Sequence, residues 1–421
     1  MFERVLPADG TQVVTAVDPL VEAAATAFLY GVAPYEMART RGERLAGGKR
    51  ENAVAHIRAL TDASDRWVTT PNVDTLYSTA WLNLAAGPVE IDLPATSDRY
   101  VSLALMDAFS DNFAVVHPCD PGAPRYTLVG PAGGMASPGR TLLRSPTDTV
   151  WALARTYVAG EADLAGARRV QDEFRVAGPA TAAASDLPTA PALRGDVAAV
   201  FAGIAAVVRT NPRPGEDTPV LAALAELGLT PGGTLAPATV LEAGRAAAWQ
   251  RMRTRGEQPR TEGWLYPKDH LGDFGGDYLF RAQVAIGGLA ALPVREAMYL
   301  RAMRSDSTMF RGGAWRLRLP PGMAPPLRDF WSLTLYEPDG AGALFFHDNP
   351  ARVYAIKSLD PELRRGADGS LDIVIAASRP NDPNANWLPA PDGAFALIFR
   401  AYGPEPAMLD RRWRLPPVEP M

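Results

Sequence analysis

The feature that most constrains the fold is that the hydrophobic pattern changes twice along the chain. From Thr70 to about Val158, short apolar runs such as VEIDLP and YVSLALMDA are separated by Pro, Gly, Asn and Asp. This spacing predicts an antiparallel, turn-rich sheet. From about Glu161 to Gly263 the chain is Ala-rich with helical periodicity, and from Trp315 onward the β pattern returns. We therefore expect two β-rich parts separated by helices.

The order of these parts predicts an α+β multidomain protein, since 421 residues exceed the size at which a single core stops growing. We expect an N-terminal mixed α/β part with an antiparallel sheet at residues 1–160 and a mainly helical middle segment at residues 161–310. The C-terminal part, residues 311–421, is expected to be a β-sandwich or jelly-roll-like domain. Both halves contain a similar strand beside an acidic turn, YVSL in the first and WSL in the second.

Local signals predict where individual helices begin and end. Asp18 followed by Pro19 is typical of a helix start, and we expect this helix to kink or end at Pro34. A second helix is expected over residues 51–60, and a further one over residues 276–302. The segment TDTVWALARTYV (residues 147–158) fits either a strand or a short helix.

Composition excludes several classes of protein. The net charge of -5 disfavours a nucleic-acid binder, which usually carries a basic face. A single cysteine allows no intrachain disulfide, and the four histidines form no metal-binding pair, so no metal is expected. No P-loop, dinucleotide fingerprint or G-x-S-x-G motif is present, so no cofactor is expected either. Without a signal segment or an 18-residue apolar run, we expect a cytoplasmic protein that does not enter a membrane.

Several long motifs resemble known families. NVDTLYSTAWLNL (residues 72–84) and DRYVSLALMDAFSDNFAVV (residues 98–116) are similar to the family catalogued as domain of unknown function 1254. The segments DFWSLTLYEPDG, NPARVYAI, DGSLDIVI and NWLPAPDGAFALIFRAYGP, between residues 329 and 404, resemble its usual partner, domain of unknown function 1214. The resemblance implies a mixed N-terminal part, a helical insertion and a C-terminal β-sandwich. It supplies no established catalytic residues, so the chemistry is argued from residue types.

The most informative stretch is TTPNVDTLYSTAWLNL, residues 69–84. A Pro-Asn pair opens a turn here, and the Asn side chain can bond backbone N–H groups, so one interpretation is purely structural. In the other, Asp74 is a catalytic base and Tyr77 a catalytic acid or hydrogen-bond donor. On a strand, Thr75, Tyr77 and Trp81 share one face, which suits the wall of a ligand site. The substrate-binding residues expected here are Asn72, Thr75 and Trp81.

A second acidic cluster ends the following strand, at Asp107, Asp111 and Asn112. Two carboxylates that share a site raise one pKa and supply an acid, which makes Asp107 a candidate catalytic residue and Asn112 a candidate substrate-binding residue. The alternative is turn capping.

A third cluster precedes the helix expected over residues 276–302. Asp277 and Arg281 are four residues apart, a spacing that suits an intrahelical ion pair. The functional alternative is that Arg281 binds a substrate carboxylate or phosphate as a fork, with Tyr278 also in contact with the substrate.

Aromatic residues and one histidine mark the C-terminal strands. Trp331, Tyr336, His347 and Trp387 are candidate substrate-binding residues, because exposed aromatic rings on a β-sandwich stack on flat ligands. The alternative is that the aromatic rings form the core of the sandwich.

These residues favour a cofactor-independent enzyme that acts by acid–base chemistry on a hydrophobic small organic substrate held between the two β-rich parts. The reaction would be a hydrolase, lyase, isomerase or cyclase step, in specialised metabolism, with Asp74, Tyr77, Asp107 and Arg281 as catalytic residues. The alternative is a non-catalytic carbohydrate- or ligand-binding protein that uses the C-terminal β-sandwich. A third hypothesis is a structural assembly unit, since sandwich edges pair readily, and the expected oligomer is a homodimer.

Overall fold

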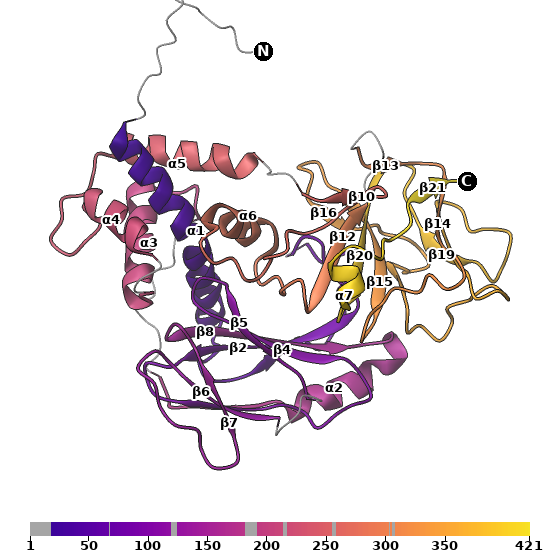
Figure 1. Ribbon diagram of the computed structural model, residues 1–421, viewed down its shortest axis with the longest axis horizontal. Coiled ribbons are helices and arrows are strands. Elements are labelled where there is room, and N and C mark those ends of the chain that lie inside the picture. Colours follow the sequence, from indigo (N-terminus) through magenta and orange to yellow (C-terminus); the bar gives the residue numbers. More distant parts are fainter. Residues whose placement is uncertain are drawn as a thin grey trace, which may run out of the picture.

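The computed structural model describes residues 18–66, 68–118, 124–181, 192–213, 217–254, 258–302, 304 and 308–421. Cys119 lies outside these residues. The fold has three groups of elements: a bundle of helices, a sheet below it, and two sheets of C-terminal strands to one side (Figure 1). The fold is thus α+β with several sheets, as predicted. Within the described part of the chain, no helix is long and apolar enough to cross a membrane.

Helix α1 (Pro19–Ala46) is the centre of the helical bundle. The Asp18 side chain accepts a hydrogen bond from the backbone N–H of Leu20, which confirms the predicted start. The helix does not end at Pro34, although an internal proline costs about 3 kcal/mol. Residues 27–37 are buried without interruption, so packing on all sides offsets the lost backbone hydrogen bond.

Four helices surround α1, and small residues let them approach closely. They are α3 (Val197–Thr210), α4 (Thr218–Glu226), α5 (Ala238–Arg253) and α6 (Tyr278–Gly288). A Cβ atom on Gly244 of α5 would lie 2.3 Å from the Cβ of Ala24 on α1. These four helices lie between residues 197 and 288, and α1 from the N-terminal part of the chain completes the bundle.

The first sheet has the strand order β1-β2-β8-β4-β5 and lies below the helices (Figure 1). Its strands are β1 (Ala55–His56), β2 (Thr75–Asn83), β4 (Val101–Met106), β5 (Asn112–Val116) and β8 (Thr149–Tyr157). The helix predicted over residues 51–60 is wrong, because this segment contains β1, which pairs with β2, and His56 bonds Ser78 across the pair. The ambiguous segment at residues 147–158 forms strand β8.

A smaller sheet and helix α2 (Leu164–Glu173) accompany the first sheet. The order of the smaller sheet is β7-β6-β3-β9. Its strands are β3 (Val89–Asp92), β6 (Arg125–Val129), β7 (Thr141–Arg144) and β9 (Arg175–Ala177). The 3-10 turn η1 (Glu161–Asp163) leads into α2.

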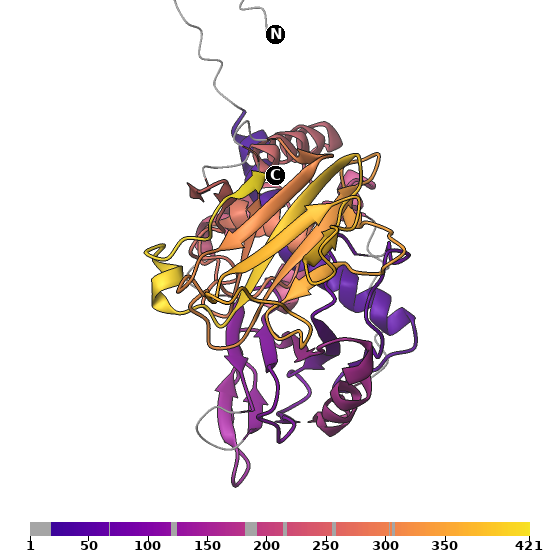
Figure 2. The ribbon, with the colours of Figure 1, turned by 90° about the vertical axis from the view of Figure 1, so that its right-hand side faces the viewer.

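The C-terminal strands form an eight-stranded and a four-stranded sheet, which lie across the front in Figure 2. The larger one, called the C-terminal sheet below, contains β10 (Arg260–Thr261), β11 (Trp264–Leu265), β12 (Ala297–Ala302), β13 (Phe310–Arg311), β15 (Trp331–Pro338), β16 (Leu344–Phe346), β17 (Ala355–Lys357) and β20 (Ala394–Tyr402). The smaller one contains β14 (Ala314–Leu319), β18 (Leu371–Ala376), β19 (Asn386–Pro389) and β21 (Val418–Pro420), and the short helix α7 (Pro406–Leu409) precedes β21. Leu317, Ile373 and Phe399 belong to one core shared by both sheets. The jelly-roll-like description stays a prediction.

The helix predicted over residues 276–302 is right only in its first half. Helix α6 ends at Gly288, and β12 of the C-terminal sheet begins at Ala297. Two glycines at the helix end and Pro293 beyond it disfavour continuation of the helix. The turn from α6 to β12 brings the helices against the C-terminal sheet and so creates the cavity described next.

Candidate active site

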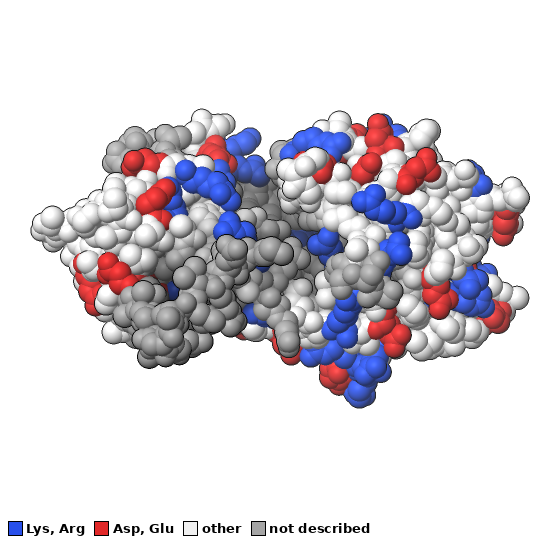
Figure 3. All heavy atoms as spheres, turned by 90° about the horizontal axis from the view of Figure 1, so that it is seen from above, with Lys and Arg blue, Asp and Glu red and all other residues white. Residues whose placement is uncertain are grey.

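A cavity of about 630 Å³ lies where the first sheet, helices α5 and α6 and the C-terminal sheet meet. Seen from above, the surface is hollowed between the helices and the C-terminal strands, with basic side chains around the hollow (Figure 3). The described residues that line the cavity include Arg155, Arg194, Arg253, Lys268 and Arg400 but no Asp or Glu. Its volume is within the range of small-molecule sites.

The first sheet contributes a row of polar side chains to one wall. Tyr77 on β2 is directly opposite Arg155 on β8, and Arg155 is directly opposite Ser102 on β4. Directly opposed residues place their side chains on the same face of a sheet. The guanidinium carbon of Arg155 lies 5.6 Å from the centre of the Tyr77 ring, within the range of a cation–π contact.

The C-terminal sheet contributes a matching row to the facing wall. Tyr299 on β12 is directly opposite Arg400 on β20, and Arg400 is directly opposite Ser332 on β15. The guanidinium carbon of Arg400 again lies 5.6 Å from the tyrosine ring, here that of Tyr299. Each β-rich part thus presents a Tyr–Arg–Ser row, and the Tyr and Arg of both rows line the same cavity.

The two arginines differ in how well their N–H groups are bonded. Arg400 donates to Thr334 Oγ1 (2.9 Å), to Tyr336 Oη (2.5 Å) and to the carbonyl of Thr70 (3.0 Å). Arg155 donates only from Nη2, to the carbonyl of Ala290 (3.1 Å), and its Nε and Nη1 have no partner among the described residues. Both arginine side chains are almost completely buried, with only 4% of each residue exposed.

Both guanidinium groups stay ionised, because the pKa of each lies above its usual value. Burial opposes the charge on Arg155, but the surrounding tyrosines, first of all Tyr77, raise its pKa above the usual value. Burial likewise opposes the charge on Arg400, and Tyr336, Tyr402 and Asp74 raise its pKa. Neither arginine has a carboxylate within ion-pair distance in the described part of the chain, so the wall carries unpaired positive charge.

Asn72 and Tyr77 both line the cavity and contact each other. The Oδ1 of Asn72 accepts hydrogen bonds from the backbone N–H groups of Asp74 (3.0 Å) and Thr75 (3.1 Å). Because these bonds fix the amide orientation, Nδ2 is the atom that donates to Tyr77 Oη, at 2.6 Å. The structural turn and the candidate site are therefore one arrangement.

Asp74 lies behind this wall and does not line the cavity. It is fully buried, its Oδ2 accepts a hydrogen bond from Ser332 Oγ (2.7 Å), and its Oδ1 has no partner among the described residues. Lys357 lies on the same side and donates to the carbonyls of Val73 (2.6 Å) and Val158 (3.1 Å). Asp74 thus joins the first sheet to the C-terminal sheet.

Asp107 and Arg281 belong to a different buried cluster, between α1, α6 and the end of β4. Asp107 Oδ1 accepts from the backbone of Phe109 (2.8 Å), and Arg281 lies 3.4 Å from Asp111. Burial, and then the charge of Asp111, raise the pKa of Asp107 to about 7. Neither Asp107 nor Arg281 lines the cavity, so the four candidate catalytic residues are not brought together.

The remaining candidates from the first half of the chain have structural contacts. Thr75 bonds Asn72, and Trp81 is buried and stacked on Trp151 at 4.9 Å. The side chain of Asn112 donates to the carbonyls of Gly272 (2.9 Å) and Ala291 (3.0 Å).

Helix α6 does not contain the expected Asp277–Arg281 ion pair. Asp277 instead caps the helix by accepting from Phe280 N (3.0 Å), and it pairs with Lys268. Arg281 is fully buried and points toward Asp111, because the cluster at the end of β4 offers it a carboxylate. Tyr278 donates to Asp217 at 3.2 Å.

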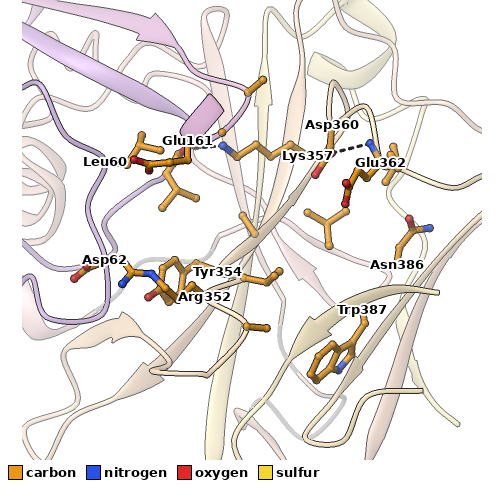
Figure 4. A pocket seen from close by; sticks show the side chains of 18 of the residues that line it. Leu60, Asp62, Glu161, Arg352, Tyr354, Lys357, Asp360, Glu362, Asn386 and Trp387 are labelled. Atoms are coloured by element: carbon orange, nitrogen blue, oxygen red, sulfur yellow. Dashed lines mark hydrogen bonds and ion pairs between the residues drawn. The ribbon is translucent and has the colours of Figure 1, made fainter. Parts of the chain in front are cut away.

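The C-terminal candidates are split between the core and a second cavity. Trp331 and Tyr336 are buried in the C-terminal sheet, and His347 bonds Glu337 at 3.0 Å. Trp387 lines a cavity of about 960 Å³, shown in Figure 4 with Lys357 across from it. The second cavity carries equal numbers of acidic and basic residues. Its acidic lining residues are Asp62, Glu161, Asp360 and Glu362, and its basic ones are Arg168, Arg352, Lys357 and Arg379.

Sequence reasoning missed Arg155, Tyr299 and Arg400. A usable signal was present, because each arginine is the single charged residue of its strand, in ALARTY and LIFRAY. An arginine at such a position must be buried with a partner or face a cavity.

Taken together, the fold and the cavity define an α+β protein in which two unlike sheets enclose a basic site. Residues 51–178 match the model of a protein family of unknown function, DUF1254, and residues 296–406 match that of a second, DUF1214. The first match covers the strands of the first sheet, and the second covers most of the C-terminal strands. The resemblance expected from the sequence is confirmed.

Two solved structures resemble this chain. The VPA0106 protein of Vibrio parahaemolyticus aligns over 96% of this chain and 100% of its own, with 19% identity and a TM-score of 0.70, which shows a shared fold. A putative uncharacterized protein of Burkholderia cenocepacia aligns over 97% of this chain and 90% of its own, with 15% identity and a TM-score of 0.46. No curated protein matches the chain.

Proposed function

We propose that the protein is a cofactor-independent enzyme that holds a small organic substrate in the cavity between the two sheets and uses Tyr77 to transfer a proton. The observation that carries the proposal is the hydrogen bond from Asn72 Nδ2 to Tyr77 Oη at 2.6 Å, at the wall of a cavity of about 630 Å³. Geometry of this kind is the first requirement for a general acid or base.

The bond from Asn72 prepares Tyr77 for this chemistry. Since Asn72 is the donor, the phenolic oxygen is the acceptor, and the Tyr77 O–H is available to a substrate. A donor to the oxygen also stabilises the phenolate that remains once the proton has left. Asn72 is therefore a positioning residue for Tyr77.

Arg155 supports the same step by its charge. Its guanidinium lies over the Tyr77 ring and favours the negative charge that develops on the phenol during proton transfer. Tyr77 would give its proton to the substrate as an acid, and the phenolate that remains would then take a proton from the product or from water. Asp74 has a positioning role in this proposal, because it lies behind the wall.

Replacement of Tyr77 by Phe tests the proposal. A panel of ketones, esters and unsaturated organic acids is incubated with the protein in D₂O, and turnover and deuterium incorporation are followed by NMR. Tyr77→Phe should reduce turnover about 100-fold or more, since general acid–base catalysis contributes typically 10²–10⁴-fold. Tyr354→Phe, at the second cavity, is the matched control and should retain wild-type turnover. Wild-type turnover in Tyr77→Phe would contradict the proposal.

Carbohydrate or ligand binding on the C-terminal strands is the second candidate function. It is favoured by Trp387, which is half-buried at the wall of the second cavity with Arg379 over its ring. Titration with oligosaccharides should then quench tryptophan fluorescence in the wild type but not in Trp387→Ala. Equal quenching in both proteins would exclude this site.

A further inference from the structure

We infer that the ligand of the cavity between the two sheets carries an anionic group, a carboxylate or phosphate, which binds to Arg155, on an apolar body that lies along helix α6. The inference deepens the proposed function, since it names the substrate class of the same site. The geometry points to it through the hydrogen bonds that Arg155 lacks, the charges of the lining and the apolar residues beside them.

Arg155 is a buried cation without an anionic partner among the described residues. It is 4% exposed and its Nε and Nη1 have no partner among the described residues, while Nη2 holds the carbonyl of Ala290 at 3.1 Å. A buried charge without a partner is costly, and a guanidinium fork matches the two oxygens of a carboxylate or phosphate. The bond to Ala290 and the contact with Tyr77 hold the fork in place before a ligand arrives.

The rest of the lining agrees with an anion. The lining includes five cationic side chains and no carboxylate among the described residues, whereas the second cavity has acids and bases in equal number. Lys268 is paired with Asp277, and Arg400 is bonded to neutral groups. Arg194 and Arg253 are exposed, so Arg155 is the buried cation that a ligand would complete.

The apolar residues define the body of the ligand. Leu271, Phe280, Val284, Ile286 and Leu289, on and around α6, line the cavity beside the polar wall. Ile286 is 48% exposed, which places a large apolar side chain where the cavity meets solvent. An anionic head at Arg155 with an apolar tail toward α6 satisfies both parts of the lining.

The test compares probes that differ only in the head group. Octanoate, octyl phosphate and the neutral octanamide are titrated into the full chain, and binding is followed by calorimetry and by the fluorescence of Trp249, which lines the cavity. The wild type should bind at least one anion about 10-fold or more tightly than octanamide, as expected for a charge-assisted hydrogen bond. The tighter anion identifies the head group, and preference for either supports the inference.

Variants locate the preference. Arg155→Met should bind anion and amide equally, Arg155→Lys should keep part of the preference, and Arg168→Met, at the second cavity, should keep all of it. Without ligand, Arg155→Met should melt at or above the wild-type temperature, because the unpaired charge is gone, and this also shows that it folds. Anion preference in Arg155→Met, equal binding of anion and amide by the wild type, or binding of no probe at millimolar concentration would overturn the inference.

Tyr77→Phe separates this inference from the proposed function. If it keeps the anion preference but turns over the organic acids as fast as the wild type, the anion site stands and the proton transfer fails. If Tyr77→Phe is inactive while Arg155→Met still prefers the anion, the proton transfer stands and the anion site fails.

Discussion

At the scale of single residues, charged side chains are buried at three separate places in the interior. Arg155 and Arg400 face the cavity, Asp74 and Lys357 lie at the junction of the two sheets, and Asp107 belongs to the cluster near α6. Buried charges are costly unless they are paired, so each of these places is a site of function or of strict structural pairing. The two arginines can bind a ligand, whereas the role of Asp107 can be tested through the stability of the fold.

Asp107→Asn should change how stability depends on pH. Burial and the nearby Asp111 raise the pKa of Asp107 to about 7, whereas an Asp in an unfolded chain titrates near 3.9. Between these values the folded state binds the proton more tightly, so the free energy of unfolding falls as pH rises from about 4 to 7. Asp107→Asn removes this loss. From pH 4 to pH 8, the free energy of unfolding of the variant minus that of the wild type should therefore rise by on the order of 2–4 kcal/mol. Urea unfolding of both proteins at pH 4 and pH 8 measures this change. The same pH dependence of the free energy of unfolding in variant and wild type would contradict the prediction.

At the scale of elements, the helical bundle depends on close approach between α1 and α5. The Cβ of an alanine at position 244 would meet the Cβ of Ala24 at 2.3 Å and the backbone N of Ala25 at 2.8 Å. Backbone atoms of a packed helix cannot move aside cheaply. The close crossing of α1 and α5 therefore requires that position 244 carry no side chain.

Gly244→Ala and Gly42→Ala should therefore have opposite effects on stability. Both positions are inside helices, where alanine is favoured over glycine by about 0.5–1 kcal/mol. A Cβ at position 42 meets no atom within 4 Å, so Gly42→Ala should stabilise by about that amount. Gly244→Ala should destabilise by about 1–3 kcal/mol through overpacking. Thermal and urea unfolding of both variants measure the two changes in stability. Equal changes of the same sign would refute the packing explanation.

At the scale of the whole molecule, one short segment joins the two β-rich parts. The backbone carbonyls of Thr70, Pro71 and Val73 accept hydrogen bonds from Arg400, Tyr336 and Lys357 of the C-terminal sheet, respectively. The side chain of Asp74 accepts one from Ser332. The same segment carries Asn72, which orients Tyr77 at the cavity wall. The relative position of the two sheets and the geometry of the site are thus set by the same residues.

Lys357→Met should loosen this junction. It leaves the carbonyls of Val73 and Val158 without their donor, and an unsatisfied buried polar group costs about 1–3 kcal/mol. We expect lower stability in urea and faster amide hydrogen exchange at residues 70–76, measured by mass spectrometry. Lys49→Met, an exposed lysine, is the control and should change neither. Unchanged exchange in Lys357→Met would show that the other contacts suffice to hold the sheets together.

The sequence by itself determined the order of the elements and much of their identity. Asp18 and Pro19 predicted the start of α1 because capping is local. The return of the β pattern after Trp315 predicted the C-terminal strands, among them β15 and β20, for the same reason. The turn at Asn72 was readable for the same reason. Where packing competes with local preference, as at Pro34 and at residues 51–60, the sequence alone gave the wrong element.

Only the tertiary structure decided which polar residues meet. Tyr77, Arg155, Tyr299 and Arg400 come from four strands up to 323 positions apart in the chain, and their pairing depends on strand register and on the junction at residues 70–74. Asp107 and Arg281, the other two expected catalytic residues, lie in another cluster. Asp107 follows β4 close to Asp111, and the side chain of Arg281 points from α6 toward Asp111. Residue types and local periodicity are written in the sequence, but the register that aligns distant side chains is set by the packing of the complete molecule.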